Sequence, residues 1–236
     1  MEYNDYINEL NKIKKDSING LNKDWKVLES VYLKVNENGE YKKFIGNTVV
    51  IPLNNEDKKK VQIIQKLLYS ELNGILANEL PEETFHLTIH DLCNYFTADN
   101  LEKCMKNSEN KVKEVFRELK EIYENTTITL NSNGLFNGGA AIGIQFYPKD
   151  FPDFNALINM YNIFEKVLPL KKILIPHVTL GYYLPKEYTY DEIQTIKKVL
   201  NDIEFSFEIT LSLNALTFQR FENMIKYIDL FSLKDI

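Results

Sequence analysis

The tetrad His86-Leu87-Thr88-Ile89 recurs later in the chain as His177-Val178-Thr179-Leu180. The chain has three histidines, and two of them begin these tetrads. Both tetrads lie in short apolar, β-branched runs, which are typical of buried strands. On a strand, residues two apart share a face and are about 7 Å apart along the backbone. Each strand therefore presents an imidazole and a hydroxyl on one side, close enough for both side chains to contact one phosphate.

The order of the other expected elements indicates an α+β fold built from two related halves, each contributing one tetrad strand. Residues 131–139 are rich in turn formers and predict a hairpin between the strands on either side. Hydrophobic patterns predict helices over residues 57–76, 97–124, 153–167 and 190–201, and strands over residues 47–53, 84–90, 126–130, 140–146, 173–184, 203–213, 215–221 and 225–231.

The first 45 residues are polar and rich in lysine, and their apolar positions predict one or two amphipathic helices. The pair Asn38-Gly39 is a strong turn signal and predicts a small hairpin between residues 32–34 and 41–43. No linker rich in proline or serine follows. We therefore expect a helical and hairpin extension over residues 1–45 that packs on a main domain over residues 46–236.

Composition limits the classes of protein to consider. A chain of 236 residues with 44% hydrophobic residues suits one ordinary globular domain. The net charge of −6 argues against an extended nucleic-acid footprint, whereas a small nucleotide or short RNA needs only a local positive pocket. The sequence shows no signal peptide and no membrane span, so we expect a cytoplasmic protein with no membrane partner. Cys93 and Cys104 are few and isolated, and we expect both to be reduced.

The two tetrads, the second followed by Gly181-Tyr182, resemble the paired H-x-T/S-hydrophobic motifs of the two-histidine (2H) phosphoesterases. That superfamily includes 2′,5′ RNA ligase-like proteins and cyclic phosphodiesterases, and the resemblance covers residues 47–231. The run from Gly46 to Val50 resembles a bacterial branch of it. The resemblance implies a bilobal α+β fold, with two halves of antiparallel sheet and flanking helices around a central cleft. It also implies metal-independent cleavage of a phosphodiester without a cofactor.

The chemistry follows from the residues as well. In-line cleavage of a phosphodiester needs a base on the attacking oxygen and an acid on the leaving oxygen. Two imidazoles meet that need, because the pKa of histidine lies near neutrality and one ring can be neutral while the other is protonated. Thr88 and Thr179 would donate hydrogen bonds to the non-bridging oxygens. His86, Thr88, His177 and Thr179 are therefore the candidate catalytic residues, and the assignment of acid and base stays open.

Several other residues are candidates for substrate binding, and each has a structural alternative. Aromatic rings near the motifs would stack on a base. Arg220 either reaches a phosphate or pairs with an acidic neighbour. His90 would share the face of His86 if the strand continues, and it then lies at the rim of the cleft or is structural. The candidates are Tyr182, Tyr183, Phe136, Arg220 and His90.

Two rival functions are weighed against the phosphodiesterase. A metal site formed by His86, His90, Asp91 and His177 is disfavoured, because His86 and His90 would be about 13 Å apart on a strand. The second rival is a binding module that holds a nucleotide or RNA end without turnover. Such a module has no chemical reason to keep both imidazoles, so the sequence favours a phosphodiesterase acting on a 2′,3′-cyclic phosphate, a 2′,5′ linkage or a cyclic oligonucleotide.

Overall fold

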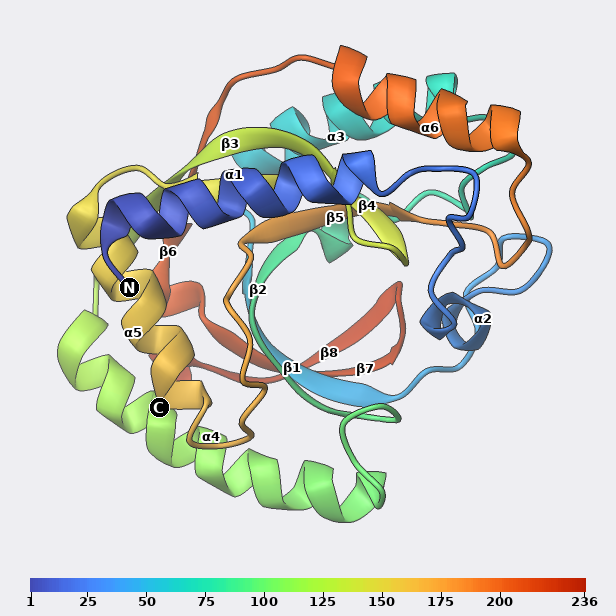
Figure 1. Cartoon of the computed structure of the whole chain (residues 1–236). Helices are drawn as coiled ribbons and strands as arrows, with labels where there is room; N and C mark the ends of the chain where they lie inside the picture. The colour runs from blue at the N-terminus through green and yellow to red at the C-terminus, as the bar shows by residue number, and fades with distance from the viewer.

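The computed structural model describes all 236 residues and contains two four-stranded antiparallel sheets with helices packed around them (Figure 1). The strand orders are β2-β1-β7-β8 and β5-β4-β3-β6. The strands are β1 (Gly46–Pro52), β2 (His86–Asn94), β3 (Thr127–Asn137), β4 (Ala141–Pro148), β5 (His177–Tyr182), β6 (Glu208–Ser212), β7 (Thr217–Asn223) and β8 (Lys226–Ser232). The longer helices are α1 (Tyr3–Asn19), α3 (Asn55–Glu71), α4 (Leu101–Tyr123), α5 (Phe151–Phe164) and α6 (Tyr190–Asp202), and α2 (Ser30–Lys34) is a single short turn.

Each tetrad strand is the edge strand of its own sheet. β2 pairs with β1 only, and β5 pairs with β4 only. The two edge strands contact each other, so the sheets meet where the tetrads lie. The predicted α+β fold of two related antiparallel halves is confirmed.

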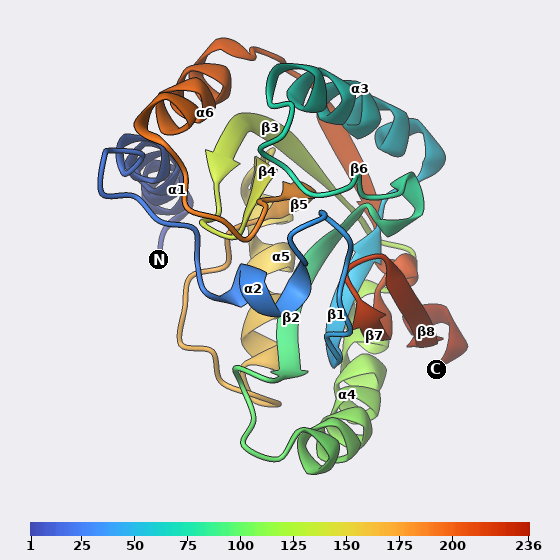
Figure 2. The same ribbon diagram turned by 90° about the vertical axis from the view of Figure 1, so that its right-hand side faces the viewer.

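The helices pack where their apolar stripes predict. α4 packs against β1 and β2 and buries Val112, Phe116 and Leu119. α1 and α6 pack against β3, α3 contacts β5, and α5 contacts strands of both sheets. Figure 2 shows α2 in front of β2, and Figure 1 shows that α2 lies apart from the other helices, on the opposite side of the sheets from α5. No helix is both long and apolar enough to span a bilayer.

The predicted amphipathic helix near the N-terminus is α1, whereas the predicted hairpin around residue 39 is wrong. The turn itself is present, because Gly39 has a φ of +81° and Asn36 accepts backbone hydrogen bonds from Asn38 and Glu40. The flanking residues do not form strands. α2 precedes the turn, and a single bridge joins Val35 to Tyr41. The Asn-Gly signal thus predicted where the chain turns, but it could not show that the residues before the turn form a helix.

The hairpin between β3 and β4 was predicted, but its first strand is longer than expected. β3 runs through the turn-rich segment to Asn137, because a bulge between Ser132 and Leu135 accommodates Asn133 and Gly134. Gly134 has a φ of +87°, which a residue without Cβ adopts at little cost. The chain reverses only at Gly138 and Gly139.

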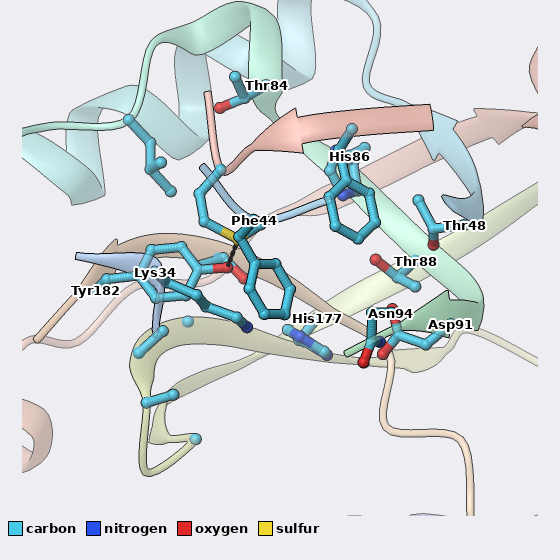
Figure 3. Close-up of a pocket in the computed structure, with 18 of the residues that line it drawn as sticks. Lys34, Phe44, Thr48, Thr84, His86, Thr88, Asp91, Asn94, His177 and Tyr182 are labelled. Carbon is cyan, nitrogen blue, oxygen red and sulfur yellow. Dashed lines mark hydrogen bonds between the residues drawn. The ribbon is translucent and has the colours of Figure 1, made fainter. Parts of the chain in front are cut away.

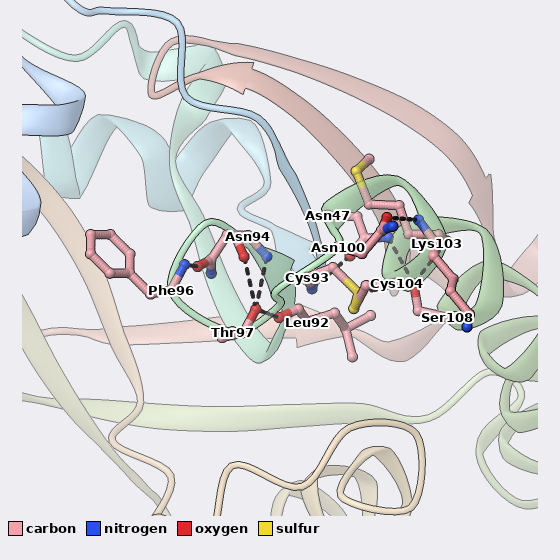
Figure 4. The surroundings of a disulfide bond; sticks show 11 residues. Asn47, Leu92, Cys93, Asn94, Phe96, Thr97, Asn100, Lys103, Cys104 and Ser108 are labelled. Atoms are coloured by element: carbon pink, nitrogen blue, oxygen red, sulfur yellow. Dashed lines mark hydrogen bonds between the residues drawn. A yellow bond between two sulfur atoms is a disulfide. The ribbon is translucent and has the colours of Figure 1, made fainter.

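The prediction that the two cysteines are reduced is wrong. Cys93 and Cys104 form a disulfide with a Cα–Cα distance of 5.9 Å (Figure 4). Cys93 lies near the end of β2 and Cys104 in the first turn of α4, and the connecting loop folds back to bring them together. The side chain of Asn47 accepts a hydrogen bond from the Cys93 backbone and donates one to Ser108 of α4, which ties the same two elements. Counting cysteines could not show this reversal of the chain.

Candidate active site

Both tetrads line one pocket. His86 and Thr88 reach it from β2, and His177 and Thr179 reach it from β5 (Figure 3). The pocket has a volume of about 330 Å³. The intervening residues Leu87 and Val178 are fully buried on the opposite faces of their strands. The alternation of a β-strand therefore directs each imidazole and hydroxyl pair into the pocket, as the sequence predicts.

A β-bulge follows the threonine in each tetrad. Val49 and Val50 of β1 pair with His90 and Thr88, which leaves Ile89 as an extra residue. The second tetrad repeats this pattern, since Ile142 and Gly143 of β4 pair with Gly181 and Thr179 and leave Leu180 as the extra residue. A bulge of this kind changes which residues face each side of the sheet. The next side chain of each strand to reach the pocket is therefore Asp91 in β2 and Tyr182 in β5.

His90 does not reach the pocket, because the bulge turns it to the other face of β2. The residue is buried, its Nε2 atom lies 3.0 Å from Oε1 of Glu165, and its ring lies against Tyr161 of α5. The structure therefore does not bring His90 to the pocket and places it in the contact between β2 and α5. The rival metal site also loses a ligand, since His86 and His90 face opposite sides of the strand.

The two histidines differ in their surroundings. Burial, together with the nearby His177, lowers the pKa of His86 to about 4, and a hydrogen bond with the Thr84 backbone only partly opposes this. His86 is therefore neutral at neutral pH. His177 directs Nδ1 to the carbonyl oxygen of Ile175 at 2.7 Å, so that nitrogen carries a proton. The ring of His177 also packs edge-on against Phe136, with 5.4 Å between the ring centroids.

Of the remaining predicted binding residues, Tyr182 and Phe136 line the pocket, whereas Tyr183 and Arg220 do not. Tyr183 follows Tyr182 on the strand and points to the opposite face, where it is fully buried and donates a hydrogen bond to Asn137. Arg220 lies on β7 with 45% of its side chain exposed, and it pairs with Glu222 at 3.5 Å. The structure therefore does not bring Tyr183 and Arg220 to the pocket, and Arg220 takes the acidic partner that the sequence left open.

The sequence did not indicate Lys34, Phe44 or Asn94 as residues of the site, and it indicated Asp91 only as a ligand of the rival metal site; all four line the pocket. Lys34 and Phe44 come from the segment before β1, which carries no motif. Asp91 sits beyond the bulge, where strict alternation from His86 would place it on the wrong face. Asn94 lies at the end of β2, where its Oδ1 accepts a hydrogen bond from the Phe96 backbone.

Comparison by sequence finds no matching family model and no matching curated protein. Comparison by structure finds similar proteins across most of the chain. The conserved protein of unknown function ATU0111 from Agrobacterium tumefaciens str. C58 has 12% identity and a TM-score of 0.62, over 92% of this chain and 98% of that one. The protein TT0787 of Thermus thermophilus has 15% identity and a TM-score of 0.53, over 80% and 98%. Escherichia coli LigT in complex with 3′-AMP has 14% identity and a TM-score of 0.47, over 80% and 97%.

At such identities the similarity to ATU0111 and TT0787 establishes the fold of this chain. The fold is an α+β arrangement of two antiparallel four-stranded sheets that bring two His-x-Thr strands to one pocket.

Proposed function

We propose that this protein is a two-histidine phosphoesterase that hydrolyses a phosphodiester in a small nucleotide or at an RNA end. One observation carries the proposal: the two His-x-Thr pairs, from edge strands of different sheets, line the same pocket. Two imidazoles and two hydroxyls suffice to contact all four oxygens of a phosphodiester. A binding module would need hydrogen-bond donors there but no pair of groups that exchange protons.

The proposed reaction is an in-line displacement by water. His86, neutral at neutral pH, takes a proton from the attacking water as the new P–O bond forms. His177 gives a proton to the leaving sugar oxygen as the old P–O bond breaks. One proton is thus taken up and one is given, and the pair returns to its starting state by exchanging protons with solvent. These steps require no metal ion and no cofactor.

The threonines complete the site. Thr88 and Thr179 lie two residues after the histidines on the same strand faces, and their hydroxyls donate to the two non-bridging oxygens, where negative charge builds up. Tyr182, Phe136 and Phe44 provide aromatic faces in the same pocket, which suit a nucleobase. A nucleotide phosphodiester therefore matches the wall of the pocket as well as its reactive groups.

A panel of phosphodiesters tests the proposal. Purified protein is incubated with a nucleoside 2′,3′-cyclic phosphate, a 2′,5′-linked dinucleotide and a cyclic dinucleotide, with and without excess chelator. We expect turnover of at least one class that survives the chelator and is lost in the His86→Ala and His177→Ala variants. Tight binding of a nucleotide with no turnover of any class would instead favour the binding module.

A further inference from the structure

Lys34 places one positively charged side chain in a pocket whose reactive groups are the two histidines. It is the only lysine or arginine that lines the pocket, in a chain whose net charge is −6. Its ammonium lies over the rings of Phe44 and Tyr182, with 5.1 and 5.3 Å from Nζ to the ring centroids. No carboxylate lies within ion-pair distance of it. The two aromatic rings therefore stabilise the ammonium in part through cation–π contacts, and no counter-ion is bound to it.

The charge is costly to keep there. Burial lowers the pKa of Lys34, and Asp91 only partly offsets the effect. Asp91 is the only carboxylate that lines the pocket, and Figure 3 shows it on the other side of His177 from Lys34. A partly buried ammonium without a protein anion gains most from an anion that enters with a ligand.

The backbone holds this lysine in place. Lys34 is the last residue of α2, between the buried Val31 and Val35, and its carbonyl accepts a hydrogen bond of 2.8 Å from the Lys42 backbone. The side chain therefore projects into the pocket from a segment that belongs to neither sheet. An anion bound there would meet a preorganised charge.

The phosphate that reacts does not need this charge. In the proposed function its four oxygens are met by His86, His177, Thr88 and Thr179. Lys34 is thus left over once the reacting phosphate has been accommodated.

We propose that Lys34 binds a second phosphate group of the substrate, so that the natural substrate is a nucleotide with a further phosphate beside the phosphodiester that is cleaved. This inference rests on the proposed function for the position of the first phosphate. Phe44 and Tyr182 flank the second phosphate site and bring an aromatic face next to it. A nucleotide with a 5′-phosphate and a 2′,3′-cyclic phosphate is one member of this class.

Binding of two nucleotides that differ by one phosphate tests this. Calorimetry compares adenosine 3′-monophosphate with adenosine 3′,5′-bisphosphate on the wild type and on Lys34→Met, Lys34→Arg and Lys43→Met. Lys43 is an exposed lysine that does not line the pocket, and its loss changes the net charge equally. We expect the wild type and Lys43→Met to bind the bisphosphate on the order of tenfold or more tightly, as a charge-assisted contact would give. Lys34→Met should lose that preference, and Lys34→Arg should keep much of it.

Three results would overturn the inference: no preference in the wild type, equal weakening of both ligands in Lys34→Met, and no binding of either nucleotide at millimolar concentration. Equal weakening would place Lys34 at the reacting phosphate. Thermal unfolding of each variant shows that it is folded. The binding comparison does not depend on turnover, so it can be made even if the protein cleaves no phosphodiester. A preference for the bisphosphate without any cleavage would refute the proposed function but would still support a second phosphate site at Lys34.

Discussion

The Nδ1 atom of His177 lies 2.7 Å from the carbonyl oxygen of Ile175, two residues earlier in the chain. A carbonyl oxygen only accepts hydrogen bonds, so Nδ1 donates and Nε2 is the nitrogen left to exchange a proton with a ligand. The contact also fixes the orientation of the ring. The backbone just before β5 thus leaves Nε2 of His177 free for the proton transfer that we propose.

Replacing either histidine should abolish turnover and leave the fold intact. General acid or base catalysis contributes about 10²- to 10⁴-fold, so His86→Ala and His177→Ala should each lose at least that much in kcat. Because the two groups act in one displacement, the double variant should be little worse than either single variant. Steady-state kinetics on the substrate found in the panel, with circular dichroism to check folding, measures this. Near-normal turnover in either single variant would disprove the mechanism.

The threonine hydroxyls should matter less than the imidazoles but clearly more than other strand hydroxyls. Thr88→Val and Thr179→Val keep the side-chain shape and remove a donor to the developing charge, which costs about 3 kcal/mol, or on the order of a hundredfold in kcat. Thr127→Val is the matched control, since Thr127 is exposed at the start of β3. If the two pocket variants behave like Thr127→Val, the hydroxyls do not contact the phosphate.

The pH profile should extend unusually far toward acid. His86 acts as the base when neutral, and its pKa is lowered to about 4, so kcat/KM should fall only as the pH drops through this value. At higher pH the rate should fall again when the acid loses its proton, which gives a broad bell that chelator does not change. Rates measured from pH 3 to pH 9 test the shape. Because kcat/KM reports the free enzyme, an acid limb centred near pH 6.5 would show that the base is not a His86 with a pKa lowered to about 4.

His86 should also make the fold less stable in weak acid. The folded-state pKa of about 4 lies below the value of 6.5 for a free histidine, so the unfolded chain binds the proton first as the pH falls. The free energy of unfolding should therefore decrease between about pH 6.5 and pH 4, by at most about 3 kcal/mol from this residue. Urea unfolding at pH 7 and pH 4.5 is compared for the wild type and His86→Gln. The variant should show a smaller decrease, and equal decreases would contradict the lowered pKa.

Reduction of the disulfide should destabilise the protein. Cys93 and Cys104 are 11 residues apart, and the loop-entropy relation gives about 3 kcal/mol for a loop of that length. Urea unfolding with and without dithiothreitol measures the difference. The Cys93→Ser/Cys104→Ser variant should match the reduced wild type and should not respond to dithiothreitol. If dithiothreitol does not change the free energy of unfolding of the wild type, the disulfide does not stabilise the fold.

The local patterns in the sequence were sufficient to predict that four side chains would lie together and which kind of element carries them. One pocket is lined by all four of the predicted side chains: His86, Thr88, His177 and Thr179. The two members of each pair could be placed on one face from the sequence, because residues two apart on a strand share a face. The longer helices were also predictable, since apolar residues that recur at helical spacing over ten or more residues indicate a helix. The turn at Gly39 was predictable because an Asn-Gly pair is itself a local signal. That signal could not show whether the residues on either side of the turn form strands.

Tertiary structure decided which residues join those four. The bulges at Ile89 and Leu180 depend on pairing with β1 and β4, so sequence alone could not show that His90 leaves the pocket face and Asp91 enters it. The disulfide depends on the short connection between β2 and α4 folding back on itself, and Lys34 depends on α2 lying beside the two sheets. A periodic pattern reports the face of one element, whereas register, bulges and loop paths are set by contacts between elements that lie far apart in sequence.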